Sequence, residues 1–189
     1  DAQESRGLGD VYKRQMKDRY SGTQIALHWL SAVLVICTLT LPYAQDLLAD
    51  LLGGTGGVFT LHKSLGLSIL LLTLLRLLVR ARHGAPQLQA DNARWQRRAA
   101  GLTHGMLYLL LMAMPLSGLL FGKRPVELFW LVSIDPLPVA DATRAVARQF
   151  HLTAKYLLFA LILGHACMAL WHHYRLRDGV LRGMLPRRS

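Results

Sequence analysis

The stretch that decides the fold is HLTAKYLLFALILGHACMALWHHY, residues 151–174. Apart from Lys155 near its start, residues 152–174 contain no Lys, Arg, Asp or Glu. A bilayer core of about 30 Å is crossed by roughly 20 residues of α-helix, so this stretch predicts a transmembrane helix. Three similar runs precede it at residues 25–43, 61–79 and 102–121, the second of them interrupted only by Lys63 and Arg76.

Backbone amides have no partner in lipid, so segments that span a membrane must be helices. The predicted fold is an all-α integral membrane protein, a bundle of four transmembrane helices. Residues 1–15 show no helical period and precede Met16, so they are interpreted as a non-native or disordered leader, and residues 16–189 as a single four-helix domain. We expect small residues to let the helices approach closely; the candidates are Gly66, Gly105, Gly118 and Gly164.

The composition excludes several other classes of protein. The 189-residue chain has 52% hydrophobic residues and a formal net charge of +11. A nucleic-acid binder would spread its basic residues over one folded surface, whereas these gather between apolar runs, so the expected partner is the lipid bilayer and not nucleic acid. Cys37 and Cys167 lie singly in apolar runs, which excludes a disulfide framework and a zinc ribbon. Any haem must be held without thioether links, because no C-x-x-C-H motif occurs.

The basic residues also predict the orientation. Most of the 22 Lys and Arg lie before the first predicted helix, after the second and after the fourth. Short loops rich in Lys and Arg stay in the cytoplasm, which predicts that both termini are cytoplasmic. The periplasmic side holds Lys63, Lys123, Arg124, Arg144, Arg148 and Lys155, together with a comparable number of acidic residues.

Histidines inside a membrane are costly, so each is a functional hypothesis. His62 and His151 open the second and fourth predicted helices on the periplasmic side. His165 follows His151 by fourteen residues, which is about 21 Å along a helix and within about 40° around it. The fourth helix therefore offers two imidazoles on one face, one near each membrane surface, as two stacked haems require. His62 is the expected partner of His151.

On the cytoplasmic side, His165 has two candidate partners. We favour His28, near the start of the first helix, although depth alone leaves His104 open. A lone intramembrane histidine is more often a hydrogen-bonded packing residue, which is the interpretation preferred for His104. No ligand role is expected for the remaining histidines, His83, His172 and His173.

Arg76 follows His62 by fourteen residues, so it lies on nearly the same helix face but at the depth of the cytoplasmic haem. A guanidinium placed there needs an anion, and a haem propionate supplies one. The alternative is that Arg76, like Arg80, extends to the cytoplasmic headgroups. Both interpretations stay open.

Several motifs together resemble one family. They are YSGTQIALHWL at 20–30, LHKSLG at 61–66, LRLLVR at 75–80, GLTH at 101–104, FHLTAKY at 150–156 and GHACMALWHHY at 164–174. Over nearly all of residues 16–189 the chain is similar to the bacterial cytochrome b561 family, and most of all to its inner-membrane superoxide oxidases.

The resemblance implies a bacterial inner-membrane protein with two b haems. It assigns His28 and His165 to the cytoplasmic haem and His62 and His151 to the periplasmic one, which favours His28 over His104. Family members of this type take electrons from superoxide and deliver them to ubiquinone. Related four-helix cytochromes are quinone-reactive electron-transfer subunits of a partner hydrogenase or dehydrogenase, and the haem ligands do not distinguish the two roles.

Two functions are therefore expected: a superoxide:quinone oxidoreductase in one chain, or an electron-transfer subunit with a redox partner protein. A transporter is disfavoured because no acidic residue lies inside a span to relay protons or cations. The quinone site is not indicated, and the candidates near a haem edge are Gln24, Trp29, Trp171, His172 and His173. Phe129 and Trp130 lie in the periplasmic loop and are candidate interfacial anchors.

Overall fold

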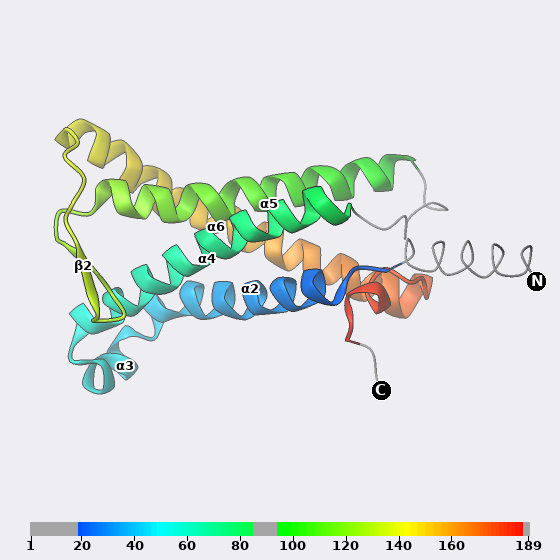
Figure 1. Cartoon of the computed structure of the whole chain (residues 1–189), viewed down its shortest axis with the longest axis horizontal. Coiled ribbons are helices and arrows are strands. Elements are labelled where there is room, and N and C mark those ends of the chain that lie inside the picture. Colours follow the sequence, from blue (N-terminus) through cyan, green and yellow to red (C-terminus); the bar gives the residue numbers. More distant parts are fainter. Residues whose placement is uncertain (1–18, 85–93, 187–189) are drawn as a thin grey trace, which may run out of the picture.

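The computed structural model describes residues 19–84 and 94–186, so the predicted leader at residues 1–15 lies outside the described residues. Four long helices form a bundle (Figure 1): α2 (Gly22–Thr40), α4 (Thr55–His83), α5 (Arg94–Phe121) and α6 (Asp141–Trp171). Each is long and apolar enough to cross a membrane. The prediction of an all-α fold with four transmembrane helices is therefore confirmed.

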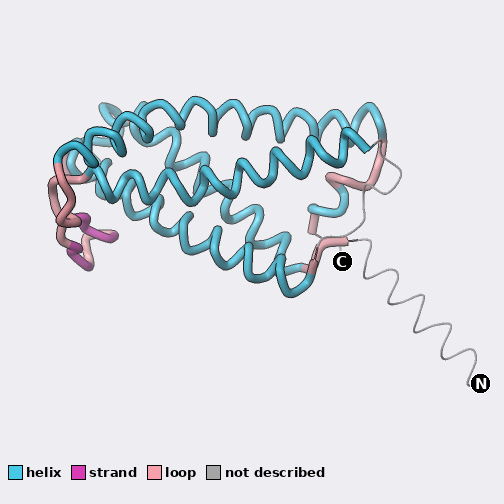
Figure 2. Tube along the Cα trace, turned by 90° about the horizontal axis from the view of Figure 1, so that it is seen from above, coloured by secondary structure: helices cyan, strands magenta, loops and turns pink. Residues whose placement is uncertain are grey.

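The bundle has two distinct ends, which we name by what lies there. The hairpin end carries an antiparallel pair of short strands, β1 (Val126–Leu128) and β2 (Val132–Ile134), seen in Figure 2 beyond the helix ends. At the tail end α2 begins and α6 finishes (Figure 1). Successive helices alternate in direction, so α4 and α6 start at the hairpin end while α2 and α5 start at the tail end.

The start of α2 is set by a reciprocal cap. The Gln24 N–H donates to Ser21 Oγ at 3.2 Å, and the Ser21 N–H donates to Gln24 Oε1 at 3.0 Å. These bonds satisfy two of the amides that a helix leaves unpaired at its first turn. Because the helix begins here, His28 lies two turns inside α2.

The helices share a narrow core in the middle of the bundle. Its buried members include Val35 on α2, Ile69 on α4, Leu111 on α5 and Leu158 on α6. Only 11% to 22% of the most apolar 18 residues in each span are buried within the protein. The remaining apolar surface faces outward on all four helices, as lipid contact requires.

The glycines do not act as predicted. No heavy atom lies within 4 Å of the position that a Cβ would take at Gly66, Gly105 or Gly164, apart from the chain neighbours and the helix's own backbone. At Gly118 a Cβ would meet only the His151 ring, at an ordinary contact distance of 3.6 Å. The expectation that these residues allow close helix contacts is wrong, because none of them lies where the backbones of two described helices meet.

The connections at the hairpin end contain structure that the sequence patterns did not predict. A short helix, α3 (Gln45–Leu52), turns sharply into α4 through Gly53 and Gly54, both with positive φ. At Gly57 only glycine fits without a clash, because a Cβ there would lie 1.7 Å from the Leu52 carbonyl oxygen. The Arg144 guanidinium donates to the carbonyls of Leu120 and Gly122 at the end of α5, and to that of Leu137 at 2.6 Å.

At the tail end the chain folds back onto α2. A π-helical turn, His172–Leu176, follows α6, and a 3₁₀ turn, Arg182–Met184, then passes beside α2 (Figure 1). The indole N–H of Trp29 donates to the Met184 carbonyl at 2.7 Å. The Arg19 guanidinium donates to the Arg182 carbonyl at 3.2 Å.

Candidate functional site

The structure brings four predicted histidines together as two pairs, one near each end of the bundle. Near the hairpin end, the ring centres of His62 on α4 and His151 on α6 are 6.4 Å apart. Near the tail end, those of His28 on α2 and His165 on α6 are 6.2 Å apart. The two pairs lie fourteen residues apart on α6, which corresponds to about 21 Å along the helix axis.

The protonation of His62 follows from its hydrogen bond. Its Nδ1 lies 3.0 Å from the Thr38 carbonyl oxygen, which can only accept, so Nδ1 carries the proton. The lone pair of the neutral ring is then on Nε2. Histidines that bind metals commonly have this arrangement, in which the second ring nitrogen donates to a carbonyl and orients the ring.

His151 has the same arrangement with one more partner. Its Nδ1 lies 3.0 Å from the Met114 carbonyl oxygen and 3.0 Å from Ser117 Oγ, while the Ser117 hydroxyl donates to that same carbonyl at 2.8 Å. Nδ1 is therefore the donor here too, and Nε2 holds the lone pair. Sequence reasoning missed the roles of Thr38, Met114 and Ser117, because two of the three act through backbone carbonyls and leave no side-chain signal.

The pair near the tail end has additional neighbours. The Arg76 guanidinium donates to Nδ1 of His28 at 3.2 Å and lies 5.4 Å from the ring centre of Tyr108. Tyr108 was not predicted, although it follows His104 by one helical turn. The His104 ring centre lies 5.2 Å from that of His165. This group is therefore a cluster of three imidazoles with one guanidinium.

The ring separations and the ligand number test which metal group fits. With metal–nitrogen bonds of about 2 Å, two imidazoles on opposite sides of one metal ion have ring centres roughly 6 Å apart. The His62–His151 and His28–His165 pairs match this separation, whereas His104 and His165 are closer together. Within the described residues, no three His, Cys, Asp or Glu side chains are placed to hold a metal ion. Two imidazoles at each level fit a metal that brings its other ligands with it, as haem iron does.

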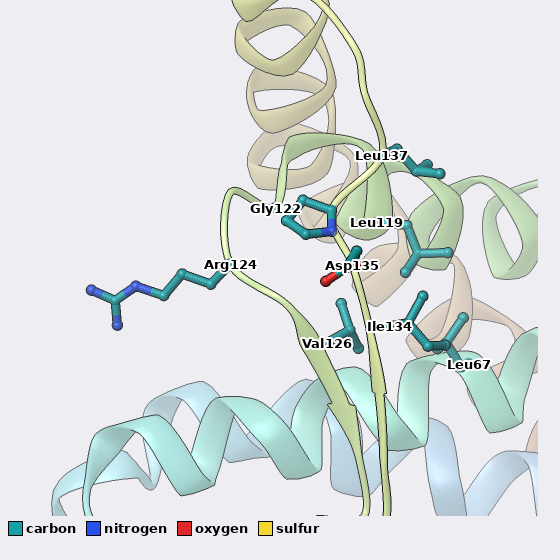
Figure 3. Close-up of a pocket in the computed structure, with 9 residues that line it drawn as sticks. Leu67, Leu119, Gly122, Arg124, Val126, Ile134, Asp135 and Leu137 are labelled. Atoms are coloured by element: carbon teal, nitrogen blue, oxygen red, sulfur yellow. The ribbon is translucent and has the colours of Figure 1, made fainter.

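An apolar cavity of about 110 Å³ lies between α4, α5 and the hairpin. Leu67, Leu119, Val126 and Ile134 line it, and Figure 3 shows the Arg124 side chain pointing away from it. Small-molecule sites usually exceed about 300 Å³, so this cavity does not define a ligand site by itself.

Three of the five predicted quinone candidates are hydrogen-bonded within the chain. Gln24 donates to the Gly84 carbonyl at 2.9 Å, and Trp29 is bonded to Met184. His172 is buried, and its Nδ1 is hydrogen-bonded to the Asp178 carboxylate. His173 is part-buried, and its Nδ1 has no hydrogen-bond partner among the described residues. Trp171 is exposed at the end of α6. No arrangement of these side chains marks a quinone site.

The basic residues of the hairpin end differ in their contacts. Lys123 forms an ion pair with Asp141 at 2.8 Å, and the Arg144 guanidinium donates hydrogen bonds to backbone carbonyls. Lys63, next to His62, and Lys155, one turn after His151, are both half-buried. The Lys155 ammonium lies 5.6 Å from the ring centre of Tyr43 and 4.9 Å from that of Tyr156. Of the basic residues at this end, Lys63 and Lys155 follow the ligand candidates most closely in sequence.

Four membrane-spanning helices with imidazole pairs at two depths define a class, the multi-pass b-type cytochromes of membranes. The chain belongs to the prokaryotic cytochrome b561 family, whose sequence model matches residues 19–187. Membership implies that it binds haem b and transfers electrons in a membrane, and the family resemblance expected from the sequence motifs is confirmed.

Relatives align with nearly the whole chain. Cytochrome b561 homolog 1 of Escherichia coli (strain K12) is 32% identical over 179 residues, covering 91% of this chain and 99% of that protein. Cytochrome b562 of Cereibacter sphaeroides is 32% identical over 173 residues, covering 89% and 96%. A protein named "Probable superoxide oxidase CybB" from Yersinia pestis is 27% identical over 184 residues, covering 92% and 99%.

Proposed function

We propose that this protein is a superoxide:ubiquinone oxidoreductase with two b haems, His62 and His151 holding one and His28 and His165 the other. The observation that carries the proposal is the matching of the two imidazole pairs, with ring centres 6.4 Å and 6.2 Å apart. When bound, the haems supply one-electron redox chemistry with potentials set by their ligands and surroundings. Two such centres let a protein collect single electrons for a two-electron acceptor.

The chain's own residues set the conditions for this transfer. The carbonyls of Thr38 and Met114 accept hydrogen bonds from Nδ1 of His62 and His151, which leaves the lone pair of each neutral ring on Nε2. A haem held by two imidazoles of the chain would supply electron transfer without binding dioxygen at its iron. Arg76 provides the positive charge for a propionate of the second haem. His104 is a packing residue beside His165.

The donor is superoxide and the acceptor ubiquinone. Two superoxide anions each lose one electron and leave as dioxygen; ubiquinone gains these two electrons and two protons and becomes ubiquinol. The naming of one relative as a superoxide oxidase supports this donor. Lys63 and Lys155, half-buried and close in sequence to the two ligand candidates, provide positive charge toward which a small anion is drawn.

The protein resides in the bacterial inner membrane with both termini in the cytoplasm. The support is the clustering of Lys and Arg before α2, between α4 and α5 and after α6. In this orientation the hairpin end and the His62–His151 pair face the periplasm. If ubiquinone is reduced near the haem of His28 and His165, it takes up its two protons from the cytoplasmic side.

The test is stopped-flow mixing of the purified chain with superoxide, followed through the haem absorption bands. We expect rapid haem reduction that superoxide dismutase abolishes, and reoxidation when ubiquinone is added. Haem reduction no faster than spontaneous superoxide decay would exclude this donor. That result would favour the second candidate, an electron-transfer subunit that receives electrons from a partner dehydrogenase or hydrogenase.

A further inference from the structure

The hairpin is attached to a membrane-spanning helix at a defined depth. Figure 1 shows it crossing the end of the bundle, and its tip reaches Ser64 on α4. The Phe129 N–H donates to Ser64 Oγ at 2.8 Å, and the Ser64 hydroxyl donates within α4 to the Thr60 carbonyl at 2.8 Å. Ser64 is only 1% exposed, so this contact is enclosed.

The depth of the tip follows from the position of Ser64. The apolar run of α4 begins near Leu61, and Ser64 is three residues further along, about 5 Å at 1.5 Å per residue. The tip therefore lies close to the boundary between headgroups and acyl chains. It is slightly deeper in the membrane than Leu61, where the apolar run of α4 begins. A side chain exposed at this depth contacts lipid.

The tip residues are both apolar and exposed. Phe129 is 42% exposed, Trp130 50% and Leu131 84%. Trp130 is the one tryptophan at the hairpin end; the other three, Trp29, Trp95 and Trp171, lie at the tail end of their helices. Tryptophan is enriched at membrane–water interfaces because its ring is apolar while its N–H is polar.

The backbone at the tip has a conformation that aromatic residues rarely adopt. Phe129 has φ 47° and Trp130 has φ 61°, and the Leu131 N–H donates to the Leu128 carbonyl at 2.8 Å. Positive φ at both central residues is the pattern of a type I′ turn, where Asn and Gly are the usual residues. Two aromatic residues in the left-handed region are unfavourable for the turn alone, so the sequence here does not serve the turn.

We propose that the Phe129–Leu131 turn is a membrane anchor that inserts into the headgroup–acyl boundary of the leaflet at the hairpin end, with Ser64 setting its depth. The occupant of this surface is lipid, because the exposed apolar tip is bonded to a membrane-spanning helix at a depth within the apolar run of that helix. Insertion would fix the hairpin over the His62 end of the bundle. This proposal does not depend on which electron donor and acceptor the protein uses.

The experiment is cysteine accessibility in proteoliposomes. In the full chain, Cys37→Ala and Cys167→Ala remove the two native thiols, and Leu131→Cys places one thiol at the tip. Lys123→Cys is the matched control, because its side chain is 70% exposed at the same end. We expect a charged, water-soluble maleimide to modify Leu131→Cys at least tenfold more slowly than Lys123→Cys, and an apolar maleimide to modify both at similar rates.

A second variant separates insertion from simple burial. Replacing Phe129 by Asn and Trp130 by Gly keeps a type I′ turn and removes both rings, so the turn still forms. In that background we expect the Leu131→Cys thiol to become as reactive toward the charged maleimide as the control. Equal reactivity of Leu131→Cys and Lys123→Cys in the parent chain would overturn the proposal. So would protection that disappears when the protein is diluted into more lipid, because the tip would then be covered by a second copy or another protein.

Discussion

The Arg76 guanidinium donates a hydrogen bond to Nδ1 of His28 at 3.2 Å. Guanidinium has no acceptor, so Nδ1 of a neutral His28 must carry the lone pair and Nε2 the proton. Coordination of iron through Nε2 requires the opposite arrangement. Haem binding by His28 and this contact therefore compete, and Arg76 must turn from the neutral imidazole toward an anion when His28 acts as a ligand.

The first prediction concerns that anion. If Arg76 faces a propionate, Arg76→Gln should keep both haems and lower the midpoint potential of one by roughly 50–100 mV, because a nearby positive charge favours the reduced state. Spectroelectrochemical titration measures this. Arg82→Gln is the control, since Arg82 is exposed at the end of α4. Equal potentials in the two variants would place Arg76 away from the haem.

Haem content is the second prediction. Two imidazole pairs with matching ring separations give an expected stoichiometry of two b haems per chain, both low-spin. A pyridine haemochrome assay against protein concentration measures the ratio. One haem per chain in a monodisperse preparation would contradict the assignment of one of the two pairs.

The third prediction separates His28 from His104. Because the His104 and His165 ring centres are 5.2 Å apart and those of His28 and His165 are 6.2 Å apart, we expect His28→Ala to lose one haem and His104→Ala to retain both. Absorption spectra and haem content of the two purified variants decide. The assignment would have to be exchanged if the outcomes were the reverse.

The fourth prediction concerns electrostatic steering of the donor. Neutralising Lys63 or Lys155 should slow haem reduction by superoxide by about two- to tenfold without changing haem content. Raising ionic strength should slow the wild type as well, since the screening length is about 10 Å at 0.1 M. Lys123→Gln is the matched control, because Lys123 is already paired with Asp141. An equal effect of all three substitutions would indicate general surface charge and no local attraction.

The fifth prediction is structural. Gly57→Ala would place a methyl group 1.7 Å from the Leu52 carbonyl oxygen, a backbone atom, whereas Gly56 has no heavy atom within 4 Å of its Cβ position. We expect Gly57→Ala to destabilise the protein by about 1–3 kcal/mol, as overpacking does, and Gly56→Ala to have little effect. Thermal unfolding in detergent compares them. Equal melting temperatures would show that α3 moves freely relative to α4.

Much of this protein is determined by sequence alone, because the signals are local. The length of an apolar run sets each membrane span. Helical periodicity places His151 and His165 on one face of α6, a relationship within a single helix that needs no knowledge of its neighbours.

Relationships between helices were decided only by the tertiary structure. The ring centre of His165 lies 6.2 Å from that of His28 and 5.2 Å from that of His104. These distances depend on how far α2 and α5 are rotated and shifted along their axes relative to α6. No local sequence pattern specifies that rotation or shift. The same holds for Thr38 and Met114, whose backbone carbonyls orient the rings of His62 and His151. The glycines were misjudged for this reason: a small residue permits close contact only where the fold brings another backbone to it, as at Gly57 and not at Gly66.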